Sequence, residues 1–476
     1  MVSERAQRGL EIPSLSSTQN KLHHDDPHHT VNNREGYIKL SSADNVLTAD
    51  IIKKKFESIN WKKFDTDLLF VYPRGGGEVS TQNSMAKFIN RYCRKGLPPI
   101  PAEQLVIVPG VTTGADLLGQ ILFDSGDVVL MPAPYYYRFA NDFGERGLIR
   151  IGVVPALSLC GKKTELVVDR FEKAYQEGMK VGKVRAVTLV NPQNPEGGYF
   201  SLDEIRPIVE WALSRDLYVV LDEIYDLTIF DECPKHPFQS ATELFVGEKA
   251  RSKLIWIALY PNPIVRTACV RFLMHHLPNT TTQFITREFI DDYEWVEKVF
   301  LPANLRRLKA ARDQVLAQLD ILKVSYIKPR AGFFVLMDLS KYLDEPTFEG
   351  ERRLHQRILK HRVIISAGET MIAPKPGWFR IVFSSVDPET LDEALMRITN
   401  ALKEQEKLNQ MLLQEAKQPE LDHINPTKTN GKSESNGTCS SLIQPNGLDI
   451  TNGQLETTTS SQVVFLKTTV SAANGH

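Results

Sequence analysis

The sequence predicts an α/β protein with a large domain, built on a mostly parallel sheet flanked by helices, and a smaller α+β domain. The first observation is that short apolar runs alternate with helical stretches in the middle of the chain. The second is that these runs are apolar on both faces, which is typical of parallel strands covered by helices. The third is that the elements after residue 300 follow a mixed, antiparallel pattern. A chain of 476 residues with 42% hydrophobic content suits two or three domains and a large core.

The strands predicted for the large domain are residues 105–108, 128–131, 186–190, 217–221 and 254–259. The clearest helix between them starts at Ser201, where Ser-Leu-Asp-Glu forms a capping box ahead of an apolar face. Residues 186–221 therefore read as one strand–helix–strand unit, which we expect to be right-handed. Because ligands of such sheets bind beyond the carboxyl ends of the strands, functional side chains are expected there.

The second region is predicted to contain a helix over residues 302–322 and strands over residues 331–337 and 378–383. A further helix follows Asp387, which is a suitable N-cap because Pro388 can take the first helical position. We therefore predict one folded region over residues 35–405. Its large domain spans roughly residues 60–300, and its small domain combines residues 35–59 with residues 301–405.

Both ends of the chain are polar and are predicted to be disordered. Residues 1–34 contain His23, His24, His28 and His29, which could form a metal site. No packed scaffold nearby would fix the ligand geometry, so a flexible tail without metal is favoured. Residues 406–476 hold the end of the last helix and then a tail rich in Asn, Ser and Thr, which cannot bury enough apolar surface to offset its ordering entropy.

Charge and cysteine usage narrow the function. The 57 basic and 58 acidic residues leave a net charge of −1, which argues against nucleic acid or an anionic membrane surface as a partner. No run approaches the roughly 20 apolar residues that a transmembrane helix requires. The 5 scattered cysteines fit a reducing compartment better than a disulfide framework. A cytoplasmic location is therefore expected.

Polar motifs follow two consecutive predicted strands. Asn-Pro-Gln-Asn-Pro-Glu-Gly at residues 191–197 could be a simple turn, because Asn, Pro and Gly are turn formers. Asp-Glu-Ile-Tyr at residues 222–225 places a carboxylate at the buried end of a strand. Burying a charge costs several kcal/mol unless a cation pairs with it, and a ligand with a protonated ring nitrogen would supply that cation.

These two motifs, about thirty residues apart, resemble the signature of class I/II aminotransferases that depend on pyridoxal 5'-phosphate (PLP). The resemblance covers residues 36–405 and extends to the 1-aminocyclopropane-1-carboxylate (ACC) synthase branch, especially its animal ACC synthase-like proteins. It is supported by the stretches at residues 43–45, 132–136, 299–302, 331–334 and 376–380. It implies a fold-type I PLP-transferase that acts on an α-amino acid as a homodimer.

The resemblance assigns four residues to the cofactor ring. Asp222 would pair with the pyridinium nitrogen, so that the ring can accept carbanion electrons. Asn194 and Tyr225 would hydrogen-bond the ring oxygen. Tyr136 would stack on the ring face, although plain core packing is an alternative for this side chain.

It also assigns residues to the cofactor phosphate and the substrate. Val111 and Thr112 would bind the phosphate at a helix N-terminus, although other strand-to-helix turns share this pattern. Tyr72 would reach the phosphate of the neighbouring subunit, in surroundings that match the family poorly. Arg380 would grip the substrate α-carboxylate bidentately, unless it lies on an exposed strand face. Asp44 would face the substrate where ACC synthases have the longer glutamate, which argues against ACC as the product.

The family's Ser-x-Ser-Lys segment, followed by Gly-x-Arg, is absent. Its lysine forms the Schiff base with the cofactor, and its arginine pairs with the phosphate. A block of about fourteen residues that carries both is missing between Ala258 and Leu259. Lys253 precedes the strand and lies about 17 Å from its far end, beyond the reach of a lysine side chain. Arg266 falls in a later, helical part of the match, so neither residue is expected to substitute.

The sequence therefore supports two functions. The first is a PLP-dependent transferase of α-amino acids, a transaminase or related lyase, that is inactive or impaired in this chain and binds PLP more weakly. The second is a non-catalytic dimeric scaffold that acts through protein partners. The assigned ring and carboxylate residues favour the first, and the missing lysine favours the second. A clean cut of this kind is compatible with a skipped exon or faulty gene model as well as with an evolved pseudoenzyme.

Overall fold

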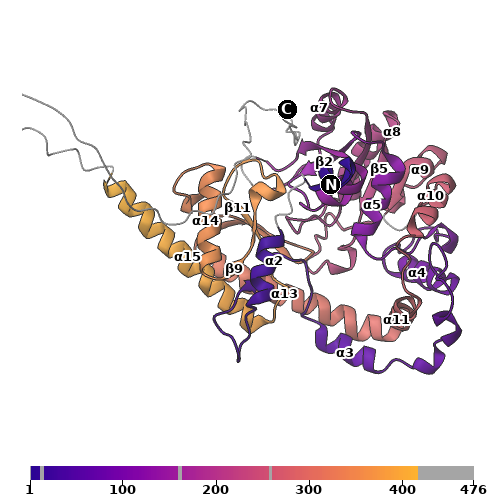
Figure 1. Cartoon of the computed structure of the whole chain (residues 1–476), viewed down its shortest axis with the longest axis horizontal. Coiled ribbons are helices and arrows are strands. Elements are labelled where there is room, and N and C mark those ends of the chain that lie inside the picture. The colour runs from indigo at the N-terminus through magenta and orange to yellow at the C-terminus, as the bar shows by residue number, and fades with distance from the viewer. Residues whose placement is uncertain (1, 11–15, 159–162, 257–259, 416–476) are drawn as a thin grey trace, which may run out of the picture.

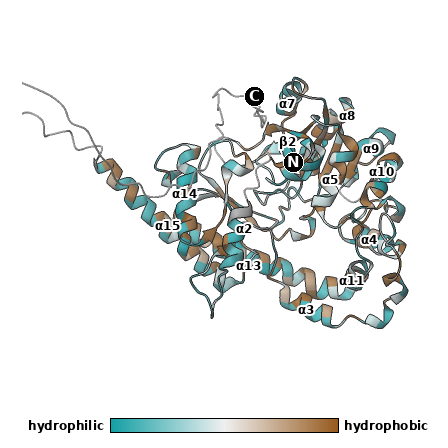
Figure 2. Cartoon of the chain, in the orientation of Figure 1, coloured by the Kyte–Doolittle hydropathy of each residue, from teal (hydrophilic) through white to brown (hydrophobic). Residues whose placement is uncertain are grey.

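The computed structural model describes residues 2–10, 16–158, 163–256 and 260–415. Figure 1 shows an α/β body around β2 and β5, a second body with α14 and β11, and the long helix α13 running between them. In the part of the chain that the structure describes, no helix is long and apolar enough to cross a membrane. Figure 2 shows apolar residues concentrated on the strands and inner helix faces, whereas the outer turns are polar.

The large sheet has five parallel strands in the order β3-β2-β4-β5-β6. Their bounds are β2 (Val128–Ala133), β3 (Arg150–Pro155), β4 (Val184–Val190), β5 (Tyr218–Asp222) and β6 (Leu254–Trp256). The chain winds from β2 to β3 in one direction and then continues from β4 to β6 in the other. The order therefore reverses between β2 and β4, which is the switch point where ligands bind in sheets of this type.

Helices cover both faces of this sheet. One face packs on α5 (Val111–Leu122), α6 (Phe139–Gly147) and α10 (Pro263–Leu273), and the other on α7 (Val168–Met179), α8 (Leu202–Ser214) and α9 (Glu248–Lys253). The capping box at Ser201 is present, and the Ser201 backbone N–H donates to Glu204 Oε2 at 2.8 Å. These helices explain why the strands are apolar on both sides.

The strands predicted at residues 128–131, 186–190 and 217–221 are confirmed as β2, β4 and β5. The strand predicted over residues 254–259 is present as Leu254–Trp256, and its last three residues lie outside the described part of the chain. The strand predicted at residues 105–108 is wrong. Leu105 and Val106 are fully buried, but the segment is anchored by single bonds such as Ile107 N to Gly76 O at 2.9 Å. A short apolar run indicates that a segment is buried, but it does not show that the segment pairs with a strand. Here the segment is buried without the hydrogen bonds of a β-sheet.

The small domain has a four-stranded antiparallel sheet in the order β10-β11-β8-β7. Its elements are β7 (Ser325–Ile327), β8 (Phe334–Asp338), β10 (Ser366–Ala367), β11 (Trp378–Val382), α13 (Leu301–Ile321), α14 (Phe348–Lys360) and α15 (Pro388–Glu415). A separate parallel pair joins β1 (Ile38–Lys39) to β9 (Val363–Ile364). The helices and strands predicted after residue 300 are therefore present.

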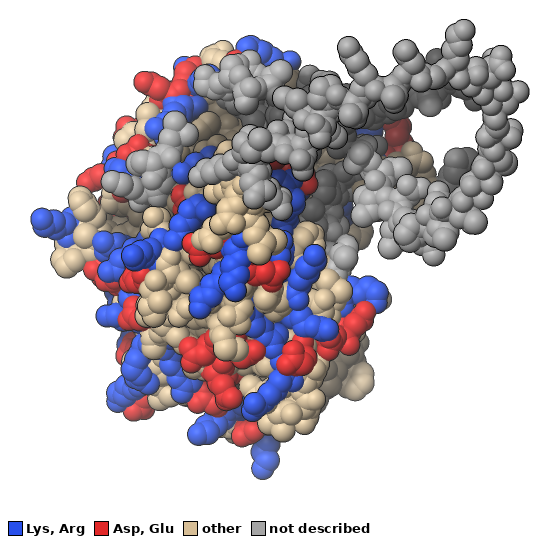
Figure 3. Space-filling view, turned by 90° about the vertical axis from the view of Figure 1, so that its left-hand side faces the viewer, with Lys and Arg blue, Asp and Glu red and all other residues tan. Residues whose placement is uncertain are grey.

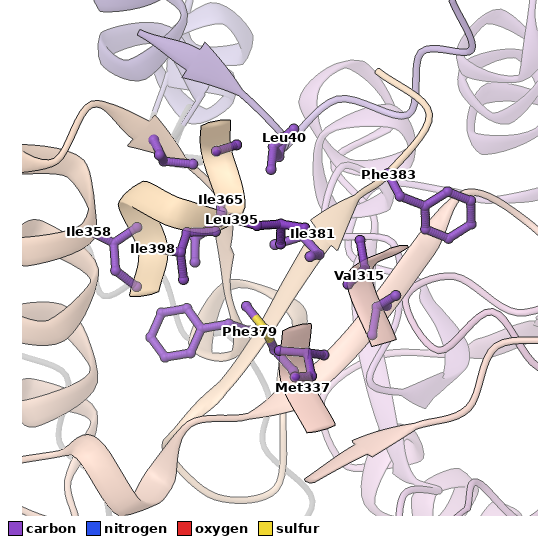
Figure 4. Packing of buried hydrophobic residues seen from close by; sticks show 14 of the residues in the cluster. Leu40, Val315, Met337, Ile358, Ile365, Phe379, Ile381, Phe383, Leu395 and Ile398 are labelled. Carbon is purple, nitrogen blue, oxygen red and sulfur yellow. The ribbon is translucent and has the colours of Figure 1, made fainter. Parts of the chain in front are cut away.

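The small-domain core brings together side chains from distant parts of the chain. Figure 4 shows Leu40 beside Ile381 and Ile365, with Val315 and Leu395 contributed by helices on either side. Residues near position 40 thus complete a core that is otherwise built from residues 308–402. This packing positions β11, the strand that carries Arg380.

The N-terminal segment differs from the disordered tail expected from its composition. It forms α1 (Glu4–Leu10) and α2 (Ser16–Asp25), and Asp26 pairs with Arg362 of the small domain. The guanidinium of Arg397 also donates to Gly36 O at 2.8 Å. His28 and His29 are used in backbone hydrogen bonds of the following turn. Charge pairing and backbone contacts order this segment despite its polar composition.

The remaining described helices are α3 (Ala49–Glu57), α4 (Val79–Tyr92), α11 (Thr280–Ile290) and α12 (Tyr293–Trp295), with 3-10 and π turns between them. α3, α4 and α11 lie in the lower right part of Figure 1, where α11 packs against α4. On the face in Figure 3, basic and acidic side chains are interleaved and no extended surface of one sign forms. That surface agrees with the balanced composition.

Candidate active site

Two of the assigned residues lie at the carboxyl edge of the large sheet. Val190, the last residue of β4, is in register with Asp222, the last residue of β5. The Asp222 carboxyl is 4% exposed and accepts the Ile224 N–H at 3.1 Å. Among the described residues no cation pairs with it. Burial therefore raises the pKa of Asp222 to about 6, because water no longer solvates its charged form.

Arg380 reaches this edge from the other domain. Its guanidinium is 1% exposed and donates to Asn194 Oδ1 at 2.9 Å, to Ser366 Oγ at 3.0 Å and to Ser41 O at 2.6 Å. The guanidinium carbon also lies 5.2 Å from the centre of the Phe334 ring. The structure thus places Arg380 in the interior between the domains and not on an exposed strand face.

The Arg380 guanidinium keeps unused donor capacity. Its Nε is buried and has no acceptor among the described residues. Burial also lowers the pKa of Arg380 from its ordinary value, although an arginine remains charged at any physiological pH. A buried cation with an unpaired N–H is suited to an anion such as a carboxylate.

Two aromatic residues complete the wall of the site. Tyr225 is 8% exposed and meets Phe333 and Phe334 edge to face, with ring centres 5.4 and 5.1 Å away. Burial raises its pKa, and a hydrogen bond with Asn194 opposes that rise. Tyr136 is half-buried and meets Phe139 edge to face at 5.2 Å. Tyr136 packs against the core of the large domain, and its stacking on a cofactor ring stays a prediction.

Val111 and Thr112 open α5 after Gly110, whose φ of 95° suits glycine. The hydroxyl of Thr112 donates to Asp142 Oδ2 at 3.3 Å. Burial raises the pKa of Asp142 to about 6, against the effect of the nearby Arg138. The helix N-terminus is thus available to an anion, but one of its hydroxyl donors is already engaged by a carboxyl group.

Two assigned residues are not drawn into this cluster. Tyr72 is 95% exposed. Asp44 is also exposed, and its backbone oxygen accepts the Ser384 hydroxyl at 2.6 Å. Among the described residues of one chain, neither Tyr72 nor Asp44 forms a hydrogen bond or an ion pair with the residues around Asp222.

Lys253 and Arg266 are both committed elsewhere. Lys253 Nζ lies 3.1 Å from Asp216 Oδ2 and 4.4 Å from the centre of the Tyr218 ring. Tyr218 begins β5 and Asp222 ends it, so the ammonium sits at the opposite edge of the sheet. Arg266 donates to Tyr260 O at 2.9 Å. Ala258 and Leu259, on either side of the sequence gap, lie outside the described residues.

The sequence did not reveal three groups that hold the site together. Ser41 contributes a backbone oxygen and Ser366 a hydroxyl to Arg380, and neither lies in a recognisable motif. Glu223 is 6% exposed and accepts from Trp256 Nε1 at 3.0 Å and from Ser240 Oγ at 2.6 Å. Its position inside the Asp-Glu-x-Tyr motif was the only available signal for a structural role beside the cofactor residues.

Comparison with known proteins decides the family. The model of the aminotransferase class I and II family matches residues 35–398. The chain belongs to this family. A human "probable inactive 1-aminocyclopropane-1-carboxylate synthase-like protein 2" is 32% identical over 84% of this chain and 74% of its own length. A bovine "1-aminocyclopropane-1-carboxylate synthase-like protein 1" is 30% identical over 82% of this chain and 80% of its own length.

Solved aminotransferases share the fold. The Thermus thermophilus aspartate aminotransferase tetra mutant 2 complexed with tryptophan superposes with a TM-score of 0.66, at 18% identity over 84% of this chain and 99% of the other. The same enzyme with maleate gives a TM-score of 0.63 at 17% identity, with the same coverage. The expected resemblance to animal ACC synthase-like proteins and the fold-type I architecture are thereby confirmed. The aminotransferase class I and II fold implies PLP as the cofactor.

Proposed function

We propose that this chain is a PLP-binding member of the ACC synthase-like group that, as it stands, does not transaminate α-amino acids at the rate of its family. One observation carries the proposal. Asp222 is a buried carboxyl at the end of β5 that lacks a cation among the described residues, while the one lysine next to β6 is held at the opposite edge. The buried Asp222 supports a site for the ring of PLP, and among the described residues Lys253 is held too far away to be its covalent anchor.

The residues around Asp222 fit the ring of PLP. A protonated pyridine nitrogen would give the Asp222 carboxylate the cation it lacks. Asn194 and Tyr225, which hydrogen-bond each other, can turn toward a ring oxygen. When bound, PLP supplies an electron sink for a carbanion, and Asp222 would keep its nitrogen protonated. Arg380 would orient a substrate carboxylate from the small domain.

The residues expected to bind the phosphate of PLP support a weak affinity for the cofactor. At the N-terminus of α5, the Thr112 hydroxyl is already donated to Asp142. Asp142 is itself an acid whose pKa lies near 6, so at neutral pH its negative charge opposes an incoming phosphate. The family's phosphate-binding arginine belonged to the missing block. We therefore infer a lowered PLP affinity in this chain and a cytoplasmic role in amino acid metabolism.

The substrate class follows from Arg380 and remains an α-amino acid. Asp44, which resemblance would place near the substrate, is exposed in the single chain, and its shorter side chain argues against ACC as a product. A transaminase or related lyase activity is thus proposed for a chain in which the missing block is restored.

Titration of the full chain with PLP tests this function. A saturable change in the cofactor's visible absorption is expected, without a borohydride-stable label on the protein, because Lys253, the described lysine next to β6, is held at the opposite edge of the sheet. Lys253→Arg serves as the control and should leave the titration unchanged, since the ammonium is bound by Asp216. Loss of the signal in Lys253→Arg, or a specific borohydride-trapped adduct in the parent chain, would show that a lysine does anchor the cofactor.

The homodimer expected from the family finds support in an exposed apolar loop. Four consecutive residues of this loop are strongly exposed, namely Leu69 (56%), Phe70 (85%), Val71 (58%) and Tyr72 (95%). The same loop continues to Gly75, which lies beside Val270 of α10 and beside Met274, the residue that follows α10. Apolar patches of this kind mark interaction surfaces, and a second copy of the chain would cover this one and bring Tyr72 to its neighbour's site.

Light scattering is expected to give a dimer at micromolar concentration for the parent chain. Replacing both exposed aromatics, Phe70→Asp with Tyr72→Asp, should shift it to a monomer, because charges at the centre of an interface cost several kcal/mol. Val246→Asp is the matched control, since Val246 is 78% exposed on another surface. A monomeric parent chain, or a double variant that stays dimeric, would remove this loop from the interface.

A non-catalytic scaffold is the second candidate. It is favoured by the position of Lys253 and by the name of the human relative, which calls that protein probably inactive. In that case the dimer persists while the full chain shows no PLP titration at all. The two outcomes therefore separate the candidates in one pair of measurements.

A further inference from the structure

A small cavity lies where the large sheet divides. The pairing between β2 and β4 ends at Leu130 and Val187, although both strands continue beyond these residues. The next residues of both strands, Met131 with Pro132 and Thr188 with Val190, line the cavity. Separation of two paired strands leaves backbone groups without ladder partners, and these groups need other partners when they are buried.

Two buried polar side chains line this cavity, and one of them has no hydrogen-bond partner among the described residues. Thr188 is 2% exposed, and its hydroxyl has no hydrogen-bond partner among the described residues. Glu196 is also 2% exposed, and its Oε1 accepts the Thr164 hydroxyl at 2.6 Å. A hydroxyl has one donor and two acceptor positions. A carboxyl group has about four acceptor positions, of which Glu196 uses those toward the Thr164 hydroxyl and its own backbone N–H. Both side chains therefore have unused hydrogen-bonding capacity at the same cavity.

The size of the cavity selects the ligand. It leaves about 20 Å³ in which the centre of a water molecule can lie. A single water requires roughly 10–15 Å³ of such space and two to four polar partners. Gln193, Asn194 and Thr164 also line the cavity and add further polar side chains. A larger organic molecule has no room, whereas one water does.

We propose that this cavity is a binding site for one ordered water, which bridges the Thr188 hydroxyl and the Glu196 carboxyl. Thr188 belongs to β4, and Glu196 belongs to the loop of residues 191–198 that carries Asn194. The water links the sheet to that loop at its switch point. Through Asn194, which accepts a hydrogen bond from Arg380, it positions the site between the domains.

The protonation of Glu196 agrees with this bridge. Burial raises the pKa of Glu196 to about 7, so that near neutral pH a large share of this group carries a proton. A protonated carboxyl can both donate to and accept from a water, whereas a carboxylate can only accept. Thr188 and Glu196, the two groups that the water bridges, are not among the residues assigned to PLP, whereas Asn194, which also lines the cavity, is.

A crystal structure of the full chain, at a resolution that shows ordered waters, tests the site directly. One water peak is expected within hydrogen-bond distance of Thr188 Oγ1 and of a Glu196 oxygen. An empty cavity would overturn the proposal, and so would a peak whose contacts and density belong to a metal cation. Neither result would bear on PLP binding, which is measured separately.

Urea unfolding gives a second test, in which the sign of the effect decides. Thr188→Val keeps the shape of the side chain and removes the hydroxyl. If a water bridges Thr188 and Glu196, the folded-to-unfolded ratio should fall roughly tenfold, because the water and the carboxyl lose a partner. If the cavity is dry, the ratio should rise, because a buried hydroxyl without a partner has been removed. Thr188→Ser retains the hydroxyl and should keep the crystallographic water.

Discussion

Insertion of a Ser-x-Ser-Lys…Gly-x-Arg block between Ala258 and Leu259 is expected to raise turnover of an α-amino acid with PLP by at least about 10²–10⁴-fold. This factor is the usual share of general acid–base catalysis alone, and the restored imine exchange adds to it. The physical reason is distance. In the parent chain Lys253 lies beside Tyr218, at the start of β5, and Asp222 ends that strand. Four residues of strand separate the two positions by about 13 Å.

The matched control is the same insertion with alanine in place of its lysine. That chain has the same added length and the same phosphate-binding arginine, so it separates the chemical role of the lysine from repair of the fold. Turnover should rise only with the lysine, whereas PLP affinity should rise with both insertions. Ordinary turnover by the parent chain, in the range of about 1–10³ per second, would contradict the proposed function.

A restored chain that binds PLP yet turns over no amino acid would favour the scaffold. The cause of the missing activity would then be sought in Asp44 and in the hydrogen bonds of Arg380. Arg380 already donates to Ser41 and Ser366 in the described structure, and a substrate carboxylate would compete with these acceptors or use the free Nε. Binding of a simple dicarboxylate to the restored chain would distinguish a blocked Arg380 from a missing catalytic group.

The sequence predicted best the features that depend on neighbouring residues, such as apolar runs and helix caps. Strands such as β4 and β5 are buried on both faces, so that their apolar runs are unambiguous, and the capping box fixed the start of α8. The segment at residues 105–108 is equally apolar, but it does not pair with a strand. Composition alone cannot distinguish a buried strand from a buried segment of this kind.

The site was predictable where a motif names a residue and unpredictable where contacts cross the chain. Asp222 and Asn194 stand in motifs beside strand ends. Ser366 and Ser41 accept hydrogen bonds from Arg380, although they lie 14 and 339 residues away in the sequence. No local sequence pattern predicts such pairs. The order in the N-terminal segment likewise depends on Arg362 and Arg397, which belong to the far end of the sequence.

Asp222→Asn is expected to stabilise the chain in the absence of PLP. The Asp222 carboxyl is buried without a cation, and its pKa of about 6 lies above the ordinary value of 3.8. That difference corresponds to about 3 kcal/mol, the gain in the free energy of unfolding expected near pH 7. Asparagine is neutral and similar in shape, and its side-chain oxygen can still accept the Ile224 N–H.

The pH dependence identifies the cause of this gain. Because the pKa of Asp222 is raised in the folded chain, its contribution to stability is complete below about pH 4 and is lost as the pH rises through 6. The parent and Asp222→Asn chains should therefore have equal urea midpoints near pH 3.8, if both remain folded there, and diverge progressively up to about pH 7. A constant difference at every pH would assign the effect to packing and not to charge.

The same substitution should weaken PLP binding while it strengthens the fold. Removing one member of a buried charge pair typically costs about 3–5 kcal/mol, so PLP affinity should fall by more than a hundredfold. The opposite signs of the two effects are the essential result, because a residue retained only for folding would not be destabilising in the unliganded chain. A variant that is less stable without PLP and binds it as well as the parent would remove Asp222 from the cofactor site.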